Sequence, residues 1–477
     1  MLLVPLRRCD DDGPARPPIP TQVVSNGEYY PLPKTGPQRQ IDERLTELAE
    51  RYGRKLGLSR RAFLRTTCGV AAALLAMDEV FAAASGRRGR RYFPRVTAAH
   101  AADPDAAEAL LGSGDDFIFD VQTHHVDIDG EWVQRNPLAV FFFRCLRTPR
   151  TCSEDSLQLL SRQNFIKEVF CDSNTTVAVL SGVPTRDERD NALPPVQIAA
   201  TRDLVNEMAG SQRLLAHGLV RPNLGWRRNR RDMTYQVRQL GIAAWKAYTG
   251  ATLGRGGWWL DDESAYRMYE HSLHLGIRNM CVHKGLPLGV FDDTYVRPRD
   301  VARAATDWPA INFIIYHSAF PYEDELVAQK TLAPAIDNVY CELGSTIAQT
   351  IITNPTRTAH VLGKLAKAFG ADHLVWGTDS IWWGSPAWQI AAFKQFQIPD
   401  EIADQNGYTP LSDADKRHIL GLTSARLYNI DPGAVRNQVA CDRISSLKAE
   451  LGTSLTRSNQ TYGPADIQAA FRLMHEG

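Results

Sequence analysis

Short apolar runs recur along the chain from residue 116 onward, and a polar or glycine-containing segment follows each of them. They cover residues 116–122, 176–181, 214–220, 242–248, 278–283, 311–317, 338–343 and 373–378. Runs of this length, apolar at consecutive positions, are typical of strands that are buried on both faces of a parallel sheet. The pattern therefore predicts eight parallel strands.

Segments with the apolar spacing of helices separate these runs. They cover residues 153–171, 195–210, 231–240, 261–275, 298–306, 323–331 and 356–369. Because strands and helices alternate, the pattern predicts βα units, and eight such units predict an α/β fold of the (β/α)₈ TIM-barrel type. A terminal helix is expected from Ser412 to Tyr428, with Ser412 as its N-cap.

The chain on either side of the barrel differs in character. The expected divisions are an N-terminal region that is disordered and then helical over 41–56 (1–58), a leader-like segment and linker (59–91), the barrel (92–430), and a C-terminal helical extension with a helix near 464–475 (431–477). A length of 477 residues fits a single barrel with such appendages.

The leader-like segment begins at Ser59-Arg60-Arg61 and continues with an apolar stretch over 66–77 and small residues over 80–84. This order resembles a twin-arginine export signal, and it implies the twin-arginine export machinery as a partner and a periplasmic location. The alternative is an ordinary amphipathic helix in a cytoplasmic protein. The apolar stretch is too short for a stable membrane anchor.

Charge and cysteine content exclude some classes of function. The formal net charge is zero, but residues 1–91 hold 16 Lys and Arg against 10 Asp and Glu, so the rest of the chain is mildly acidic. An acidic barrel argues against a nucleic-acid partner. The eight cysteines form no Cys-x-x-Cys pair, which argues against a cysteine-ligated zinc site, although Cys145 and Cys152 are close enough to pair in an oxidising compartment.

Candidate chemistry lies where the apolar runs end. His124, His283, His317 and Asp379 each stand at or just after the end of a predicted strand. Because the carboxyl ends of barrel strands meet at one face, these side chains form a plausible metal coordination set. Alternation along the first strand places Gln122 on the same face as His124, while His125 points the other way and is expected to be structural.

With these residues the chain resembles the amidohydrolase superfamily, in particular the group related to aminocarboxymuconate-semialdehyde decarboxylase. The resemblance covers residues 115–430. It rests on the Asp-x-x-x-His motif of Asp120 and His124, on His283 and His317, on the Gly-Thr-Asp-Ser segment 377–380, and on the closing pattern over 411–428. Members usually carry His-x-His at the end of the first strand, and here Gln122 stands in place of the first histidine.

The resemblance implies roles for these residues. Gln122, His124, His283 and Asp379 would hold one divalent metal ion, with Gln122 as a weak ligand. Zn²⁺ is expected, Mn²⁺ is the more oxygen-preferring alternative, and loss of the metal is a third outcome. His317 would lie beside the metal-bound water, and Asp379 would also accept the proton of that water.

Other residues near the strand ends could bind or surround a substrate. Lys246 and Arg221 are candidates for holding a substrate carboxylate. Lys246 could instead be a carbamate bridge, or form an ion pair with Glu342. The pairs Trp258-Trp259 and Trp382-Trp383 follow the fourth and eighth strands and could line an aromatic or apolar pocket, or form packing or dimer contacts.

The leading hypothesis is a metal-dependent hydrolase in which activated water attacks an amide, ester or lactone carbon of a small organic substrate. One alternative is non-oxidative decarboxylation of an aromatic or unsaturated acid. Another, from a different class, is an exported, metal-free binding protein on a barrel scaffold. The expected partners are a small-molecule substrate and a second copy of the chain, with no nucleic acid.

Overall fold

The structure of the chain is a computed structural model. The structure describes residues 17–23, 33–86, 90–112, 116–146, 157–251, 256–287 and 291–451. The expected helix near 464–475, and the expected pairing of Cys145 with Cys152, lie outside the described residues and side chains.

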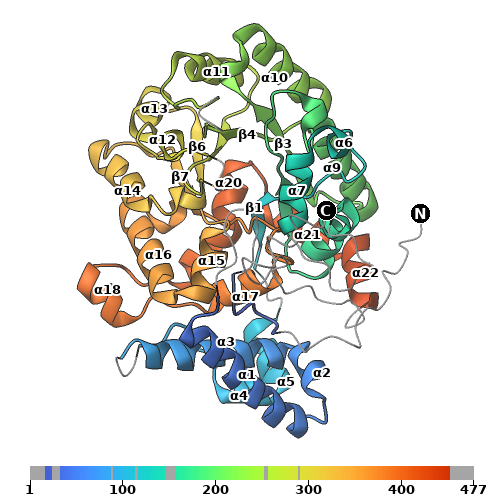
Figure 1. Ribbon diagram of the computed structural model, residues 1–477, viewed down its shortest axis with the longest axis vertical. Helices are drawn as coiled ribbons and strands as arrows, with labels where there is room; N and C mark the ends of the chain where they lie inside the picture. The colour runs from blue at the N-terminus through green and yellow to red at the C-terminus, as the bar shows by residue number, and fades with distance from the viewer. Residues whose placement is uncertain are drawn as a thin grey trace.

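Eight parallel strands form one sheet in the order of the chain. They are β1 (Phe119–Thr123), β2 (Val177–Leu180), β3 (Leu214–Val220), β4 (Ala244–Tyr248), β5 (Asn279–His283), β6 (Asn312–Tyr316), β7 (Val339–Glu342) and β8 (Leu374–Val375). The backbone N–H of Val121 donates to Trp376 O at 3.0 Å, and that of Asp379 donates to Gln122 O at 2.9 Å. These bonds join β1 to the segment after β8, and the predicted (β/α)₈ barrel is confirmed (Figure 1).

Helices surround the sheet and connect its strands (Figure 1). After β1 come α6 (Trp132–Arg135), α7 (Pro137–Leu146) and α8 (Arg162–Ile166), and the next connections hold α9 (Pro195–Ala209), α10 (Trp226–Leu240), α11 (Glu263–His274), α12 (Asp293–Val296), α13 (Val301–Asp307), α14 (Glu323–Leu332), α15 (Thr346–Thr353) and α16 (Pro355–Phe369). After β8 come α17 (Ala387–Gln395), α18 (Asp400–Asn406), α19 (Asp413–Arg417), α20 (Thr423–Leu427), α21 (Pro432–Ala440) and α22 (Arg443–Leu451).

Most elements differ by a few residues from their predicted ranges, and two of them differ in character. Within the helix expected over 153–171, the structure describes a 3-10 turn over Gln158–Leu160, then α8, then a π-helical turn over Lys167–Cys171. Strand β8 has two residues, shorter than predicted, because the backbone N–H of Trp376 donates to Ile419 O, in the turn between α19 and α20, at 3.0 Å. The chain after β8 therefore leaves the ladder early, and Asp379 lies on an irregular segment at the barrel mouth.

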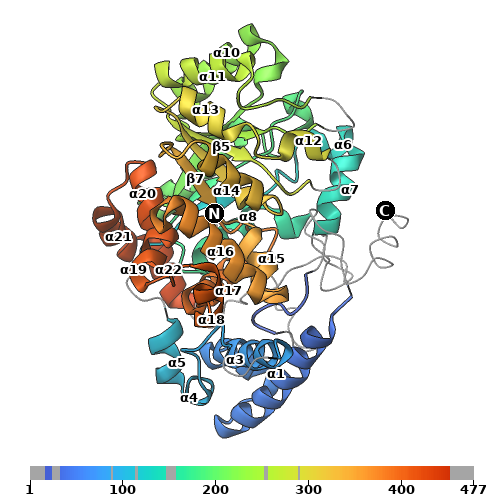
Figure 2. The same ribbon diagram turned by 90° about the vertical axis from the view of Figure 1, so that its left-hand side faces the viewer.

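The C-terminal helices close the barrel interior at the amino ends of the strands. Phe119 packs on Tyr428 with ring centroids 5.2 Å apart. Asn279 at the start of β5 donates to Leu427 O at 2.8 Å. Figure 2 shows α20 and α21 on one side of the barrel and α6, α7 and α12 on the other. The opposite end, where the strands finish, is therefore the open one.

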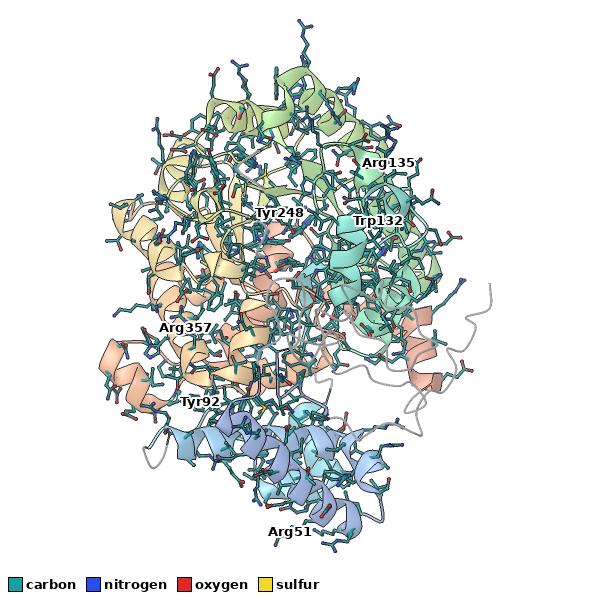
Figure 3. The ribbon with its side chains drawn as sticks, in the orientation of Figure 1. Arg51, Tyr92, Trp132, Arg135, Tyr248 and Arg357 are labelled. Atoms are coloured by element: carbon teal, nitrogen blue, oxygen red, sulfur yellow. The ribbon has the colours of Figure 1, made fainter. Side chains whose placement is uncertain are left out.

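The N-terminal region forms a separate helical layer against the side of the barrel (Figures 1 and 2). It holds α1 (Gly36–Lys55), α2 (Arg60–Leu64), α3 (Thr67–Ala84), α4 (Ala98–Ala102) and α5 (Pro104–Leu111). The buried carboxylate of Asp78 accepts hydrogen bonds from the backbone N–H of Tyr92 at 2.6 Å and Phe93 at 2.9 Å. Both rings pack on Phe396, and Tyr92 marks this junction in Figure 3.

The twin-arginine-like segment lies within this layer. Ser59 caps α2, which contains Arg60 and Arg61, and α3 carries the apolar stretch. By length and composition α3 could cross a membrane, yet most of it is buried inside the fold. Export through this segment stays a prediction from the sequence.

Candidate metal centre

One half of the site lies where β1 meets the segment after β8. His124 Nε2 lies 3.0 Å from Asp379 Oδ1, and both side chains are almost completely buried. Gln122 Nε2 donates to the same carboxylate oxygen at 2.9 Å and lies 3.5 Å from His124 Nε2. Ser345 Oγ donates to Asp379 Oδ2 at 2.5 Å. Three of the predicted ligands therefore come together here, and Ser345 fixes the carboxylate from behind.

The other half lies at the ends of β5 and β6. His283 Nδ1 lies 3.1 Å from His317 Nε2, and both rings are buried. The structure thus places the fourth predicted ligand, His283, against His317, the residue expected beside the water. Tyr316 pairs with His283 across the two strands, so His317 follows one residue beyond the end of β6.

The outer nitrogen of each histidine contacts a backbone carbonyl. His124 Nδ1 lies 2.8 Å from Ser181 O, His283 Nε2 lies 2.9 Å from Leu286 O, and His317 Nδ1 lies 2.8 Å from Gly344 O. A carbonyl oxygen only accepts hydrogen bonds, so each of these ring nitrogens carries the proton. In a neutral ring the inner nitrogen therefore carries a lone pair. These inner nitrogens are His124 Nε2, His283 Nδ1 and His317 Nε2.

Among the described residues these lone pairs mostly face acceptors, and the Gln122 amide, 3.5 Å from His124 Nε2, is the donor that reaches one of them. His283 Nδ1 and His317 Nε2 face each other, and His124 Nε2 faces a carboxylate oxygen, so each contact needs a proton or a cation between its atoms. The Gln122 Oε1 atom is also buried, with no hydrogen-bond partner among the described residues. Turning that amide over would place its oxygen beside His124 and Asp379. Inward-facing lone pairs with carboxylate and amide oxygens are the donors that a divalent cation takes.

The four candidate ligands do not meet around one point in this structure. Within the part of the chain that the structure describes, no three His, Cys, Asp or Glu side chains lie close enough together to hold a metal ion. His124 and Asp379 instead share contacts with the amide of Gln122. The donor chemistry therefore fits a metal ion best on the β1 and β8 side, with His283 on the facing side.

Several site residues have left-handed backbone conformations. The φ angle is +61° at His317, +55° at Ser345 and +58° at Asp379. A residue with a side chain is strained there by about 1–3 kcal/mol, and such strain persists only where surrounding contacts fix the conformation. Here the contacts include the bond from Ser345 to Asp379 and the bond from the backbone N–H of His317 to Glu342 Oε2 at 2.8 Å.

Burial and neighbouring charges set the protonation of the carboxyl groups. Burial acts to raise the pKa of Asp379, but the close contact with His124, the nearby His317 and the hydrogen bond from Ser345 outweigh burial and hold that pKa below its usual range. Burial raises the pKa of Glu342 to about 8 and that of Asp120 to about 7. Asp379 is therefore the carboxyl group of this region that stays ionised.

Aromatic rings cover both halves of the site. Trp382 stacks on His124 with centroids 5.3 Å apart, and Tyr248 stacks on His283 at 4.5 Å with the planes 13° apart. The ring centroid of Phe291 lies 5.8 Å from that of His283. Trp382 therefore covers His124, and its role as a wall of a substrate pocket stays a prediction. Trp258 is instead a buried support whose Nε1 donates to Tyr248 O at 2.8 Å.

The two predicted substrate-binding cations lie in different places. Lys246 is buried inside the barrel, with Nζ 3.3 Å from the ring centroid of Tyr316. Arg221 directly follows β3 and lines a cavity of about 740 Å³ together with Tyr248 and Phe291. Arg221 is therefore positioned to meet a molecule entering the mouth, while Lys246 lies beneath it.

His125 lies away from the site, and three groups of the site were not predicted. His125 contacts Thr201 Oγ1 at 3.0 Å, on α9, which agrees with its expected structural position. Ser345, Tyr248 and the carbonyl of Ser181 were not among the predicted site residues. Tyr248 could have been found, because it shares a strand face with Lys246 and ends β4.

The amidohydrolase family model matches residues 237–430. None of the curated proteins matches the chain. Similar solved structures include an uncharacterised TIM-barrel protein from Bordetella bronchiseptica (17% identity, 67% of this chain and 99% of that chain, TM-score 0.45). They also include a probable 2-pyrone-4,6-dicarboxylic acid hydrolase from Acinetobacter baumannii (11%, 66% and 99%, 0.41) and 5-carboxyvanillate decarboxylase from Novosphingobium aromaticivorans (11%, 67% and 97%, 0.41).

Proposed function

We propose that this chain, whose residues 237–430 match the amidohydrolase family model, is a metal-dependent hydrolase of a small organic substrate. The observation that carries the proposal is the inward-facing set of lone pairs on His124 and His283 beside the ionised Asp379 and the amide of Gln122. Histidine nitrogens pinned by carbonyls from outside are the usual arrangement of metal-binding imidazoles.

Named residues of the chain would hold the metal ion and accept the proton. His124, Asp379 and Gln122 would hold the metal from the β1 and β8 side, and His283 from the β5 side. A divalent cation lowers the pKa of the water that it binds, to about 7 in the best-known zinc enzymes. Asp379 is ionised and fixed by Ser345, so its carboxylate is ready to accept a proton.

His317 is suited to steer the reacting group. Burial lowers its pKa to about 4, so the ring is neutral near pH 7, and its Nδ1–H is committed to Gly344 O. Its Nε2 therefore offers a fixed acceptor toward the site. In hydrolysis this acceptor would orient the attacking water toward an amide, ester or lactone carbon.

Decarboxylation of an aromatic or unsaturated acid is the second candidate, and one observation favours it. Arg221 lines the cavity beside Tyr248, where it could anchor a carboxylate. Both reactions need the same metal-binding residues. They differ in the product, because only decarboxylation releases CO₂.

Elemental mass spectrometry of the full chain, purified without chelators, tests the proposal. About one equivalent of Zn²⁺ or Mn²⁺ is expected, and it should be lost in His124→Ala and Asp379→Ala. His274→Ala is the matched control, because His274 is exposed on α11. Turnover of ester, lactone and aromatic-acid panels, with CO₂ measured in parallel, then separates the two reactions.

Absence of metal in the wild-type chain, even after incubation with Zn²⁺ and Mn²⁺, would overturn the proposal. In that case the barrel would be a metal-free binding protein. Circular dichroism of each variant ensures that a loss of metal is not a loss of fold.

A further inference from the structure

Trp383 is buried directly behind the metal centre. Beside Trp382 it was a candidate for a pocket wall, yet its side chain has no exposed surface. Its indole Nε1 donates to Ser345 Oγ at 2.8 Å, and Ser345 Oγ in turn donates to Asp379 Oδ2 at 2.5 Å. All three side chains are buried. A chain of two hydrogen bonds therefore runs from Trp383 to the carboxylate of the candidate metal centre.

The direction of this chain is fixed at its indole end. A hydroxyl group has one proton to donate and two lone pairs to accept with, whereas an indole N–H can only donate. The contact with Trp383 therefore occupies a lone pair of Ser345 Oγ, and the hydroxyl proton is left for Asp379 Oδ2. Because each bond in such a chain polarises the next, the indole also makes the hydroxyl group a stronger donor.

The other oxygen of the carboxylate faces the site. Asp379 Oδ1 lies 3.0 Å from His124 Nε2 and accepts a hydrogen bond from Gln122 Nε2 at 2.9 Å. Because Ser345 holds Oδ2, the carboxylate is kept from exchanging its two oxygens by rotation. Trp383 therefore determines, through Ser345, which oxygen of Asp379 is presented to a cation.

The loop that carries Ser345 also contacts other residues of the site. It follows β7, and Gly344 O accepts from His317 Nδ1 at 2.8 Å. A Cβ added at Gly344 would collide with Gln122 Oε1, so only glycine fits between this loop and that amide. Ser345 has a φ of +55°, a conformation that persists only where contacts hold it. The bond from Trp383 to Ser345 thus helps to fix a loop that touches both halves of the site.

Trp383 is itself firmly held. Its backbone carbonyl accepts from Trp388 Nε1 at 3.1 Å, and the backbone N–H of Gly384 donates to Ile381 O at 3.1 Å. Trp388 belongs to α17, which packs on α15, the helix that follows the Ser345 loop (Figure 1). The indole donor is therefore anchored by α17 and not by the site that it supports.

We propose that Trp383 is a positioning residue. It directs the hydroxyl of Ser345 at Asp379 and so keeps Asp379 Oδ1 turned toward His124 and Gln122. Its effect on metal affinity rests on the proposed function, whereas its hold on the carboxylate does not. Groups that hold a metal ligand from outside typically change metal affinity by about 10–100-fold when they are removed.

The affinity of the full chain for Zn²⁺ and Mn²⁺, measured by competition with a chromophoric chelator, tests the effect on metal binding. Trp383→Phe keeps an aromatic ring but removes the N–H, and it should weaken binding by about tenfold. Ser345→Ala should weaken binding at least as much. The double variant should lose no more than Ser345→Ala alone, because Trp383 acts through that hydroxyl. A tryptophan that only fills space would add a further loss.

Trp245→Phe is the matched control. Trp245 is equally buried, and its Nε1 donates to Ser272 Oγ on α11 at 2.7 Å. The substitution removes the same kind of indole-to-hydroxyl bond between β4 and the outer helices, so metal affinity should stay that of the wild type. Circular dichroism checks that each variant is folded.

Nuclear magnetic resonance of the tryptophan indole groups in the metal-free chain tests the hold on the carboxylate. The Trp383 resonance, identified by its absence in Trp383→Phe, should move upfield in Ser345→Ala, because the indole proton loses its acceptor. It should move in the same direction by a smaller amount in Asp379→Asn, since the hydroxyl then donates to a neutral group and polarises the indole bond less. The Trp245 resonance should stay in place in both variants.

Three results would each overturn the inference. They are unchanged affinity in Trp383→Phe when the wild type binds metal, an additive loss in the double variant, and a Trp383 resonance that stays in place in Ser345→Ala or in Asp379→Asn. A wild-type chain that binds no metal, with both resonance shifts present, would support the hold on the carboxylate while the proposed function fails.

Discussion

Two polar clusters lie inside the same barrel, one at its mouth and one deeper in the interior. The floor cluster consists of His217, Cys281, Tyr316 and Tyr428, between the mouth and the C-terminal helices. Its groups meet complementary partners: His217 Nδ1 lies 2.9 Å from Ser181 Oγ, His217 Nε2 lies 3.1 Å from Tyr428 Oη, and Tyr316 donates to Val121 O at 2.6 Å. Hydroxyl groups can donate or accept, so every contact is satisfied by rotation alone.

The mouth cluster consists of Gln122, His124, His283, His317 and Asp379. Here two ring nitrogens face each other, and another faces a carboxylate, while each ring proton is committed to a carbonyl on the far side. The side chains of both clusters are buried except that of Tyr428, which is partly exposed. The difference teaches that burial alone does not identify a functional cluster, whereas a mismatch of donors and acceptors does.

The largest expected effect comes from removing the charge of the mouth cluster. Asp379→Asn keeps the size of the side chain but removes a metal ligand and proton acceptor, so the chain should lose most of its metal and its turnover should fall by about 10²–10⁴-fold. Elemental mass spectrometry and steady-state kinetics measure both. Full metal and full turnover in this variant would show that the mouth cluster is no more functional than the floor.

An equally buried charge outside the mouth should affect stability instead. Arg213 holds Asp442 with Nε and Nη2 at 2.6 and 2.8 Å and so ties β3 to the C-terminal helices. Asp442→Ala leaves the guanidinium buried without its carboxylate and should cost about 3–5 kcal/mol of unfolding free energy. Urea unfolding measures this cost, and metal content should not change. Loss of metal in the folded variant would erase the contrast between the two ends.

Replacing Gln122, the weak candidate ligand, should strengthen metal binding by the mouth cluster. Gln122→His places an imidazole where the amide oxygen stands, so zinc affinity should rise by about tenfold or more. Competition with a chromophoric chelator measures the affinity, and Gln349→His on α15 is a matched control for added histidine. Unaltered or weaker zinc binding would mean that Gln122 does not face the metal.

The smallest effect is expected at the floor. Tyr428→Phe removes the hydroxyl that contacts His217 and should lower the unfolding free energy by about 1 kcal/mol. Thermal unfolding measures the loss. Metal content and turnover should remain those of the wild type, and a clear decrease in either would link the floor cluster to catalysis.

The strands and most helices could be predicted because their signals are local. Apolar runs located β3 at its full extent, and the order of strand ends placed His283 and Asp379 at one face. Register is not local. The contact between His317 and His283 depends on the pairing of β5 with β6, and the contact between Gln122 and Asp379 depends on how β1 pairs with the segment after β8.

Two other features could not be predicted from the sequence because they depend on long-range contacts. The apolar stretch of α3 has the composition of an export signal and of a core helix alike, and only its packing places it inside the helical layer. Ser345 carries no motif, and its role follows from a left-handed backbone that turns its hydroxyl toward Asp379. Such long-range contacts decide chemistry without leaving a local pattern.

Anomalous X-ray diffraction from crystals of the full chain grown with Mn²⁺ tests the central claim most directly. One anomalous peak is predicted within bonding distance of His124 Nε2 and a carboxylate oxygen of Asp379. Diffraction that shows these two atoms in direct contact, with no anomalous peak in the barrel mouth, would contradict the account.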